Sequence, residues 1–323
     1  MPAKPQTIGE WLEWALKRYE RHHVALGQVA DNAHDEALYL LLRTLALPLE
    51  SPRSVLRRKV TPEQAARIAE VFRRRTEEHV PAAYLTKEAW LGDLKFYVDE
   101  RVIIPRSYFV ELLPEIAEVV ECRAGSLIPP RPGSKPRKTK GGISDPALPS
   151  RVVKRVVDVC TGSGCLAVLL AHQFPDAKVD AIELSPDAAA VAKFNLASHH
   201  LTARVKLWHS DVFDAVPKAK YDVILSNPPY VPTRELRDLP EEFKNEPRMA
   251  LDGGKDGLDI VRKLLLQARD RLHKHGIVVL EVGQAKAALN QAFPELDPHW
   301  LHTQDGEDCV CVIQAERLLK WEG

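Results

Sequence analysis

The sequence predicts an α/β fold: a mostly parallel sheet covered by helices on both faces, closed by an antiparallel hairpin and preceded by a small helical domain. Residues 7–79 show helical periodicity, whereas residues 151–323 alternate apolar segments with helical ones. Such alternation is typical of a parallel sheet with crossover helices. We therefore expect a helical domain with a connecting hairpin at 1–122, a flexible basic linker or loop at 123–150, and the sheet domain at 151–323.

Strong helix signals open the N-terminal domain. The segment TIGEWLEWALKRYER repeats apolar residues at spacings of three and four, and Thr7 provides a capping-box start. The apolar segment DEALYLLLRTLAL predicts a second helix, which Pro48 ends. Thr61 followed by Pro62 marks the start of a third helix, so we expect a small bundle.

A change of pattern follows the bundle. The segments EAWLG, LKFYVD and RVIIP predict short strands around a turn at Gly92-Asp93. The segment YFVELLPEIAEVVE then predicts a helix, although Pro114 stands in its middle. These strands would form the hairpin that connects the bundle to the rest of the chain.

The stretch 123–150 is rich in Pro, Gly, Ser and Lys/Arg and has almost no apolar pattern. It cannot bury enough surface to order itself, so we expect a flexible linker or loop. Its basic centre, RPGSKPRKTK, either contacts rRNA weakly or stays a solvated loop.

Strand and helix signals alternate in the sheet domain. Strands are predicted at KRVVDVC, AKVDAIEL, RVKLWHS, YDVILS and GIVVLEVG. Helices are predicted at CLAVLLAHQF, SPDAAAVAKFNLASH and GLDIVRKLLLQARDRLHKH, the last of them ended by Gly276. The segments HWLHTQ and DCVCVIQAE flank Asp305-Gly306, a hairpin signal that adds an antiparallel edge.

The amino-acid composition does not indicate a particular class of binding partner. Lys+Arg and Asp+Glu both number 45, so the formal net charge is zero and nothing global points to nucleic acid or to a membrane surface. The five cysteines fit neither a disulfide framework nor a paired zinc site, and we predict no metal. Because no segment is typical of a signal peptide or a membrane span, we expect a soluble, cytoplasmic protein. The sequence makes no prediction of oligomeric state.

A glycine-rich loop, DVCTGSGCLA, follows the first strand of the sheet domain and opens a helix. Gly162 and Gly164 let the backbone turn tightly and approach a ligand at the helix N-terminus. Glu183 ends the next strand, where an acidic side chain accepts hydrogen bonds from ribose hydroxyls. On these features alone an NAD-dependent dehydrogenase fits equally well.

Two further carboxylates favour S-adenosylmethionine over a dinucleotide. Asp158 stands at the strand end before the loop, where it can meet a cationic or amine-bearing ligand. Asp211 ends the third strand, a position suited to accept from an adenine amino group. We also expect Thr161 and Val212, which adjoin these features in the chain, to contact the cofactor.

The motif SNPPY, residues 226–230, ends the fourth strand, so Asn227 should face the same crevice as the glycine loop. An amide or exocyclic amine is a poor nucleophile, because its lone pair is delocalised. The Asn227 side-chain oxygen and the Pro228 carbonyl, held by Pro229, can accept both N–H hydrogens and aim that lone pair at a sulfonium methyl group. The Tyr230 ring offers a face for a planar group. The motif therefore predicts methylation of a planar nitrogen.

Together DVCTGSGCLA, ELSPDA, SNPPYV and EPRMALDGGKDGLD resemble the HemK-type protein-glutamine N5-methyltransferases. The resemblance covers nearly the whole chain except 123–150, and AYLTKEAWLGDLKFYVDERVIIPRS is similar to the branch called PrmB. It implies a seven-stranded, Rossmann-like class I methyltransferase domain after a helical domain that recognises substrate. It further implies methyl transfer from S-adenosylmethionine to a glutamine side chain of a large-subunit ribosomal protein, the third in the usual numbering.

Residue by residue, the resemblance implies that Asn227 contacts both cofactor and substrate. It implies that Pro228 to Tyr230 hold the glutamine amide, and that the glycine loop, Glu183 and Asp211 hold the cofactor. Glu183 stands where Asp is common in the family, and its longer arm should still reach a ribose. Arg106 either steers the substrate or pairs with an acidic neighbour.

Other functions remain open at this point. A release-factor glutamine would keep the chemistry and change the substrate. An RNA or DNA amino-methyltransferase shares the Asn-Pro-Pro-Tyr motif, and the basic insert alone favours it. A non-catalytic binding module, such as a ribosome-assembly factor, would not need the intact motif at Asn227 to Tyr230.

Overall fold

A computed structural model of the chain describes residues 5–27, 29–121 and 151–321. Its contacts divide the chain into two compact units. The helical unit is Met1–Arg106 with Leu236–Arg248, and the sheet unit is Ser107–Glu235 with Met249–Gly323. The predicted linker at 123–150 and its basic centre lie outside the described residues, and the predicted division into domains stays a prediction.

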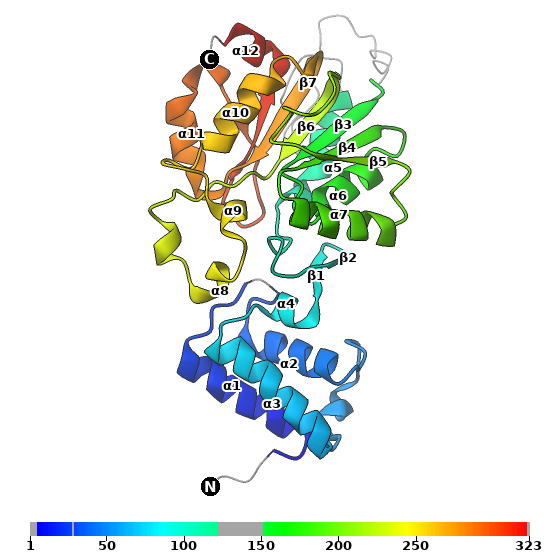
Figure 1. The fold of residues 1–323 in the computed structure, drawn as a ribbon, viewed down its shortest axis with the longest axis vertical. Coiled ribbons are helices and arrows are strands. Elements are labelled where there is room, and N and C mark those ends of the chain that lie inside the picture. The colour runs from blue at the N-terminus through cyan, green and yellow to red at the C-terminus, as the bar shows by residue number, and fades with distance from the viewer. Residues whose placement is uncertain (1–4, 28, 122–150, 322–323) are drawn as a thin grey trace, which may run out of the picture. The chain divides into compact units, whose positions relative to one another are not determined.

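The body of the helical unit consists of α1 (Ile8–His22), α2 (Ala33–Thr44) and α3 (Pro62–Glu77). These helices lie side by side (Figure 1) and share one apolar core, to which Ile8, Leu40 and Phe72 contribute. Thr61 and Gln64 form the capping box at the start of α3. The predicted bundle is therefore confirmed, and each helix buries the stripe that its periodicity indicates.

A buried ion cluster holds the later segment 236–248 in this unit. Arg75 of α3 is 0% exposed and donates to the Glu36 carboxylate at 2.7 Å and to the Glu242 carboxylate at 3.1 Å. The segment contains η2 (Leu236–Asp238) and α8 (Glu241–Lys244), which carries Glu242. A buried charge without an opposite charge nearby is costly, so the close contacts of Arg75 with Glu36 and Glu242 favour this position of the segment.

A short hairpin, β1 (Glu88–Leu91) and β2 (Leu94–Tyr97), follows α4 (Ala82–Thr86) and confirms the predicted turn at Gly92-Asp93. The prediction of a third strand at RVIIP is wrong, because residues 101–105 form no strand. The Ile104 amide donates to the Glu246 carboxylate at 3.4 Å instead of to a neighbouring strand. Pro105 has no N–H to offer a ladder.

The sheet unit contains one seven-stranded sheet in the order β5-β4-β3-β6-β7-β9-β8. Its strands are β3 (Arg155–Val159), β4 (Lys178–Glu183), β5 (Val205–His209), β6 (Tyr221–Ser226), β7 (Leu272–Glu281), β8 (His299–Trp300) and β9 (Val310–Gln314). The strands β3 to β7 pair in parallel, whereas β9 pairs antiparallel with both β7 and β8. This confirms the predicted parallel sheet with a closing antiparallel hairpin.

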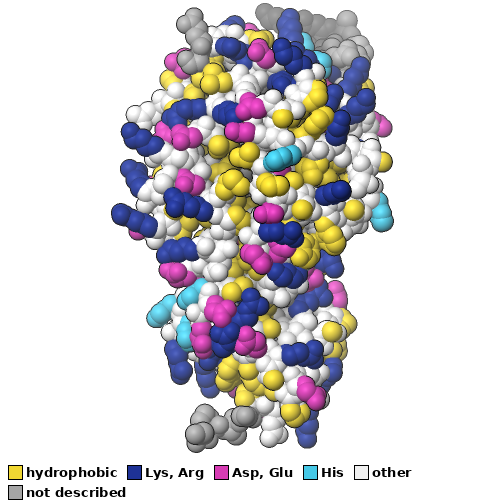
Figure 2. Space-filling view, in the orientation of Figure 1, with side chains coloured by type: hydrophobic (Ala, Val, Ile, Leu, Met, Phe, Trp, Pro, Cys, Tyr) yellow, Lys and Arg dark blue, Asp and Glu magenta, His cyan; other side chains and the backbone are white. Residues whose placement is uncertain are grey.

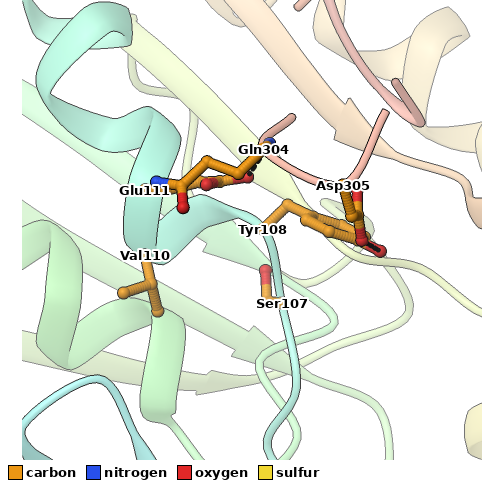
Figure 3. A pocket seen from close by; sticks show the side chains of 6 residues that line it. All are labelled: Ser107, Tyr108, Val110, Glu111, Gln304 and Asp305. Atoms are coloured by element: carbon orange, nitrogen blue, oxygen red, sulfur yellow. Dashed lines mark hydrogen bonds between the residues drawn. The ribbon is translucent and has the colours of Figure 1, made fainter. Parts of the chain in front are cut away.

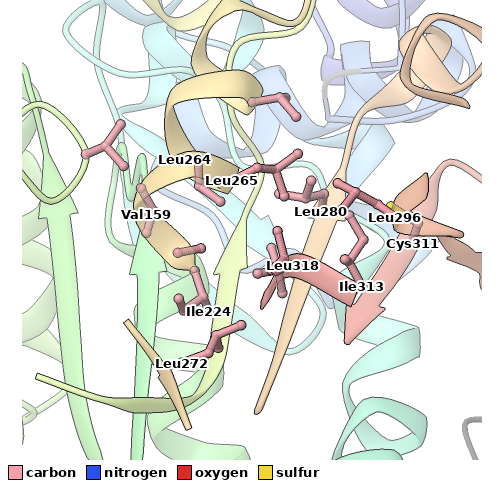
Figure 4. Close-up of a cluster of buried hydrophobic side chains, with 14 of the residues drawn as sticks. Val159, Ile224, Leu264, Leu265, Leu272, Leu280, Leu296, Cys311, Ile313 and Leu318 are labelled. Atoms are coloured by element: carbon pink, nitrogen blue, oxygen red, sulfur yellow. The ribbon is translucent and has the colours of Figure 1, made fainter. Parts of the chain in front are cut away.

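The helices of the sheet unit are α5 (Phe109–Glu121), α6 (Cys165–Gln173), α7 (Pro186–Ser198), α9 (Arg248–Leu251), α10 (Asp259–Ala268), α11 (Lys286–Ala292) and α12 (Ala315–Lys320). Alternate residues of β3, Val157 and Val159, belong to one buried cluster. Figure 4 shows Val159 in this cluster together with Leu264 and Leu265 of α10 and Leu318 of α12. The strand period of two puts the other residues on the opposite face, where α5, α6 and α7 pack. Helices therefore cover both faces, as predicted.

The predicted helix after Gly257 is wrong in its length. It ends at Ala268, and Leu272 already belongs to β7, so Gly276 lies inside a strand rather than after a helix. An added Cβ at Gly276 would lie 2.8 Å from the Tyr221 carbonyl oxygen, next to an irregular register between β6 and β7. Pairing with β6 thus overrides the helical pattern of RLHKH, a tertiary effect that local propensity does not contain.

None of the helices in the described part of the chain combines the length and the apolar composition of a membrane span. The described residues also contain no cluster of His, Cys, Asp or Glu suited to hold a metal ion. The four described cysteines, Cys160, Cys165, Cys309 and Cys311, are free thiols.

Candidate active site

The candidate site lies beyond the carboxyl ends of neighbouring parallel strands. Glu183 ends β4, Asn227 follows β6 and Glu281 ends β7, while the glycine loop follows β3. The strand order places β3 at the centre of this group, between β4 and β6. Ligands of open parallel sheets bind at this edge, so the sheet brings together the residues that the sequence indicates.

The glycine loop turns sharply into α6. Gly162 and Gly164 both have positive φ, +55° and +82°, a region that favours glycine. An added Cβ at Gly164 would lie 3.2 Å from the Cα atom of Ala192 in α7, so the loop also packs closely on that helix. The buried Asn195 of α7 donates to the Ser163 carbonyl oxygen at 2.9 Å. Sequence analysis did not identify this support, because Asn195 stands 32 residues away in an ordinary helical segment.

Glu183 faces the glycine loop and also binds its backbone. Its carboxylate accepts from the Gly162 amide at 2.8 Å and from the Ser185 amide at 2.9 Å. Burial raises the pKa of Glu183 above its ordinary value, and these amide hydrogen bonds oppose the shift. Each carboxylate oxygen has a second lone pair, so Glu183 can still accept from hydroxyl groups of a ligand.

Asp158 is completely buried beneath the loop. The Thr161 hydroxyl donates to its Oδ2 atom at 2.5 Å. The Oδ1 atom of Asp158 and the buried Ser163 hydroxyl make no hydrogen bond of good geometry. Burial raises the pKa of Asp158 to about 7, although the Thr161 hydroxyl and the Ala167 amide are close enough to lower it. Unsatisfied buried polar atoms are rare in folded proteins, so a carboxylate and a hydroxyl in this state fit a site that a polar ligand completes.

We expect Asp158→Asn to change how stability depends on pH. Because the pKa of Asp158 is raised in the folded state from 3.8 to about 7, its protonation stabilises the fold below about pH 4, and this contribution is lost as the pH rises to 7. The uncharged variant should be more stable than the parent above pH 7, by on the order of 2–4 kcal/mol, and the difference should shrink toward pH 4. Urea unfolding across this range measures it.

The matched control for this experiment is Asp176→Asn. Asp176 is exposed in the turn between α6 and β4, so the same chemical change there should leave the pH profile of the parent unaltered. A pH-independent difference between Asp158→Asn and the parent would contradict the assignment of a raised pKa to Asp158.

Asp211 and Val212 follow β5. The Lys263 ammonium group of α10 lies 2.7 Å from the Asp211 carboxylate and 2.6 Å from that of Asp214. Val212 adopts a positive φ of 51° and buries its side chain in the apolar cluster. The predicted contacts of Asp211 and Val212 with a cofactor stay predictions. Lys263 was not identified from the sequence, since its helix carries only an ordinary charged face.

The Asn227 carboxamide is oriented by a carboxylate. Its Nδ2 atom donates to Glu281 Oε1 at 3.0 Å, and the preceding Ser226 hydroxyl donates to the Val159 carbonyl oxygen at 2.6 Å. Pro228 is buried, whereas Asn227, Pro229 and Tyr230 are partly exposed. The motif thus combines a fixed backbone with an accessible amide and ring.

The segment EPRMALDGGKDGLD packs on this motif. The Val231 amide donates to the Leu251 carbonyl oxygen at 2.9 Å, and the Gly253 amide donates to the Val231 carbonyl oxygen at 2.9 Å. Gly257 has a φ of +83°, and a Cβ there would lie 2.3 Å from the Tyr230 carbonyl oxygen. Glycines therefore let this segment lie directly against the backbone of residues 229–231.

We expect Gly283→Ala to impair methyl transfer by displacing Tyr230. An added Cβ at Gly283 would lie 2.5 Å from Tyr230 Cε2 and 2.7 Å from Cζ, so the ring has to move. A misplacement of about 1 Å near reacting groups can cost up to about 100-fold in rate, and we expect kcat/KM for substrate to fall at least about tenfold. Gly306→Ala is the matched control, because Gly306 also has positive φ but has no atom within 4 Å of the added Cβ. Equal losses in the two variants would contradict a role for the ring.

A shallow hollow opens beside this site. It is lined by Ser107, Tyr108, Val110, Glu111, Gln304 and Asp305. In Figure 3 the Tyr108 hydroxyl reaches Asp305, to which it donates at 2.6 Å, and the Gln304 backbone reaches Glu111. Ser107, on the wall of the hollow, donates to Glu281 Oε2 at 2.5 Å. Hydrogen bonds therefore connect the hollow through Glu281 to Asn227.

Sequence analysis did not identify Glu281. A single signal was available: an acidic residue ends the apolar strand GIVVLE, one residue after the position that pairs with Ser226. For Arg106, the structure shows the acidic neighbour that one of the two interpretations requires. Its guanidinium binds the Glu246 carboxylate at 2.8 and 3.0 Å and lies over the Phe243 ring.

Comparisons with known proteins show the family of the chain. A model of the methyltransferase small domain matches residues 146–298. A protein of Burkholderia pseudomallei named ribosomal protein uL3 glutamine methyltransferase is 41% identical over 324 residues, which cover 98% of this chain and 97% of that protein. Proteins of the same name from Neisseria gonorrhoeae and Bordetella pertussis are 40% and 41% identical over 313 residues, which cover 97% of this chain and 96% of each relative.

These similarities confirm the predicted family and its methyltransferase activity, and the seven-stranded sheet is that of a class I methyltransferase. Methyltransferases of this class generally use S-adenosylmethionine. The chain belongs to the family of ribosomal protein uL3 glutamine methyltransferases.

Proposed function

We propose that the protein transfers a methyl group from S-adenosylmethionine to the side-chain amide nitrogen of a glutamine in ribosomal protein uL3. The observation that carries the proposal is the Asn227 carboxamide, whose Nδ2 atom donates to Glu281 at 3.0 Å. This bond leaves the Asn227 oxygen to accept from a substrate amide. The relatives of the same name, about 40% identical over nearly the whole chain, support the choice of substrate.

The residues around the glycine loop fit the cofactor. S-adenosylmethionine supplies a methyl group on a positively charged sulfur, together with a ribose and an adenine. Glu183 offers acceptors for ribose hydroxyls, and Asp158 keeps a buried oxygen without a hydrogen bond of good geometry near the loop of Thr161, Gly162 and Gly164. We assign Asp211 and the Val212 backbone to the adenine, where a cofactor amino group would compete with Lys263 for the Asp211 carboxylate.

Orientation of the glutamine amide is the main task of the SNPPY motif. The Asn227 side-chain oxygen and the Pro228 carbonyl accept the two N–H hydrogens, so the nitrogen lone pair points away from both acceptors and toward the methyl group. As the nitrogen attacks, its hydrogens become more acidic and these hydrogen bonds strengthen, which stabilises the transition state. Tyr230, with Pro229, supports the planar amide from one face. The nitrogen then loses one proton to water, and a neutral methylated amide remains.

Surface charge gives little support to a nucleic-acid substrate. On the face shown in Figure 2, Lys and Arg side chains are interspersed with Asp and Glu over both units. The formal net charge of the chain is zero, whereas binding of nucleic acid relies on neutralising phosphates with basic groups. The basic insert at 123–150 lies outside the described residues, and we propose only a weak contact with rRNA for it. We further propose that the enzyme acts in the cytoplasm, where ribosomal proteins are made.

The test is transfer of labelled methyl groups to purified uL3, a release factor and rRNA, side by side. We expect label on uL3, recovered as N5-methylglutamine after proteolysis and lost when the acceptor glutamine is replaced. Label on the release factor would keep the chemistry and overturn the substrate. Label on rRNA would overturn the glutamine assignment itself.

A further inference from the structure

The hydrogen bonds around Glu281 have a fixed direction. Glu281 Oε2 accepts from the Tyr108 backbone amide at 3.2 Å, and a backbone N–H can only donate. The Ser107 hydroxyl oxygen accepts from the Phe109 amide at 3.1 Å, so its own proton is directed to Glu281 at 2.5 Å. Two donors next to the start of α5 thus require Glu281 to act as an acceptor on that side.

The same carboxylate meets Asn227 on its other side. Glu281 is 4% exposed, and its Oε1 atom is 3.0 Å from Asn227 Nδ2. An ionised carboxylate accepts only, so it selects the rotamer of Asn227 that presents Nδ2 to Glu281 and Oδ1 to the opposite side. Without that partner, the two flipped orientations of the Asn227 carboxamide differ little in shape and would be populated about equally. In one of the two, Asn227 would present its NH₂ group to the N–H groups of a substrate.

We propose that Glu281, held by Ser107 and Tyr108, is a positioning residue that keeps the Asn227 oxygen directed at the acceptor nitrogen. The inference rests on the proposed function, because it assumes an N–H-bearing substrate at Asn227. Glu281 acts through Asn227 and does not itself receive the substrate proton. Its contribution is a choice between two orientations of one amide, made in advance of substrate binding.

Glu281→Gln should reverse this choice while preserving the size of the side chain. The Tyr108 N–H and the Ser107 O–H require an acceptor, so the new amide oxygen turns toward α5 and its NH₂ group faces Asn227. Asn227 then flips to accept from that NH₂ group and presents its own NH₂ group to the substrate. We expect kcat to fall about 100-fold, as on removal of one preorganised hydrogen-bonding group, with little change in the melting temperature.

The decisive experiment exchanges the two groups. In Asn227→Asp/Glu281→Gln, the new carboxylate accepts from the new amide and directs its second oxygen to the substrate, so the polarity of the pair is restored. Asn227→Asp alone sets two carboxylates against each other and should be as impaired as Glu281→Gln. We expect the double variant to be at least about tenfold more active than either single variant, whereas independent effects would multiply to about a 10,000-fold loss.

Activity is measured as labelled methyl transfer to uL3 with kcat and KM determined separately at several pH values. Multiplicative losses in the double variant would overturn the inference. So would loss of one limb of the pH profile of kcat in Glu281→Gln, because that result would make Glu281 a general base. A parent enzyme inactive on uL3 would instead contradict the proposed function, so the two failures are distinguishable.

Two further variants control for folding and for the exchange of charge. Ser107→Ala removes one donor and leaves the Tyr108 amide, so Glu281 stays an acceptor and kcat should fall only a few-fold. If Ser107→Ala were as impaired as Glu281→Gln at an unchanged melting temperature, the orientation argument would fail. Glu316→Gln, on the exposed face of α12, applies the same chemical change far from the site and should leave kcat unchanged.

Discussion

Asn227→Ala is expected to lower kcat for methyl transfer about 100-fold or more, with a much smaller effect on cofactor affinity. The change removes the side-chain oxygen that accepts from the substrate amide and leaves the Pro228 carbonyl as the other acceptor. Loss of one preorganised polar group at a reacting centre typically costs about 100- to 1,000-fold in kcat. Single-turnover measurements with labelled S-adenosylmethionine would separate this chemical step from product release.

The physical reason is that the glutamine nitrogen is not nucleophilic by itself. Its lone pair is delocalised into the carbonyl group, and the enzyme recovers reactivity by holding both hydrogens in one geometry. The substrate retains its other contacts in Asn227→Ala, so KM for uL3 should rise less than kcat falls. A loss confined to KM would mean that Asn227 only binds substrate.

Asn290→Ala is the matched control for this experiment. Asn290, on α11, accepts from the Trp300 indole at 3.0 Å at an exposed position. The same truncation there should leave kcat within about twofold of the parent, since exposed substitutions away from a site have small effects. Equal losses in both variants would indicate instability rather than chemistry.

The elements that sequence analysis identified correctly are those whose signals are local. The glycine loop, Glu183 and Asn227 each sit at the end of an apolar strand, and the alternation of strands and helices implies that these ends share one edge. Strand pairing then brings them together without further information. This is why the position of these residues at one edge of the sheet could be predicted before any contact was known.

The errors and omissions share a different cause, because they depend on partners that are distant in sequence. RVIIP is apolar and β-branched, yet Ile104 donates to Glu246, 142 residues later. RLHKH continues a helical pattern, yet Leu272 pairs with Tyr221 of β6. Glu281 carries no motif, and its role follows from two donors, Ser107 and Tyr108, that reach it from another element. Periodicity records which face of an element is apolar, but not which residue will meet it.

Arg75→Met is expected to destabilise the helical unit by about 3–5 kcal/mol, the cost of breaking a buried ion pair from one side. Arg75 is 0% exposed and is the cation that meets both the Glu36 and the Glu242 carboxylates. Burial by itself would lower the pKa of Arg75, but these carboxylates raise it above its ordinary value, so the guanidinium stays charged. Methionine is apolar and somewhat smaller, so it leaves the buried Glu36 carboxylate without a cation and Glu242 with only the His79 ring, at 3.2 Å.

Hydrogen exchange resolves this effect within a chain of two units, whose unfolding need not be two-state. Amides of α1, α2 and α3 should exchange faster in Arg75→Met, whereas those of β3 to β7 should keep their protection. Arg74→Met is the matched control, because Arg74 lies on the same helix, is exposed and pairs with Glu78 only at 3.6 Å. It should change stability by less than about 0.5 kcal/mol.

A second substitution tests whether the penalty is electrostatic. Glu242→Gln in the Arg75→Met background removes one of the two buried negative charges and retains an oxygen that accepts from the Ala25 amide, a bond of 3.0 Å in the parent. If burial of unpaired charge causes the instability, the double variant should be more stable than Arg75→Met alone. If lost packing of the long Arg75 side chain causes it, the second change should bring no recovery, because it restores no volume.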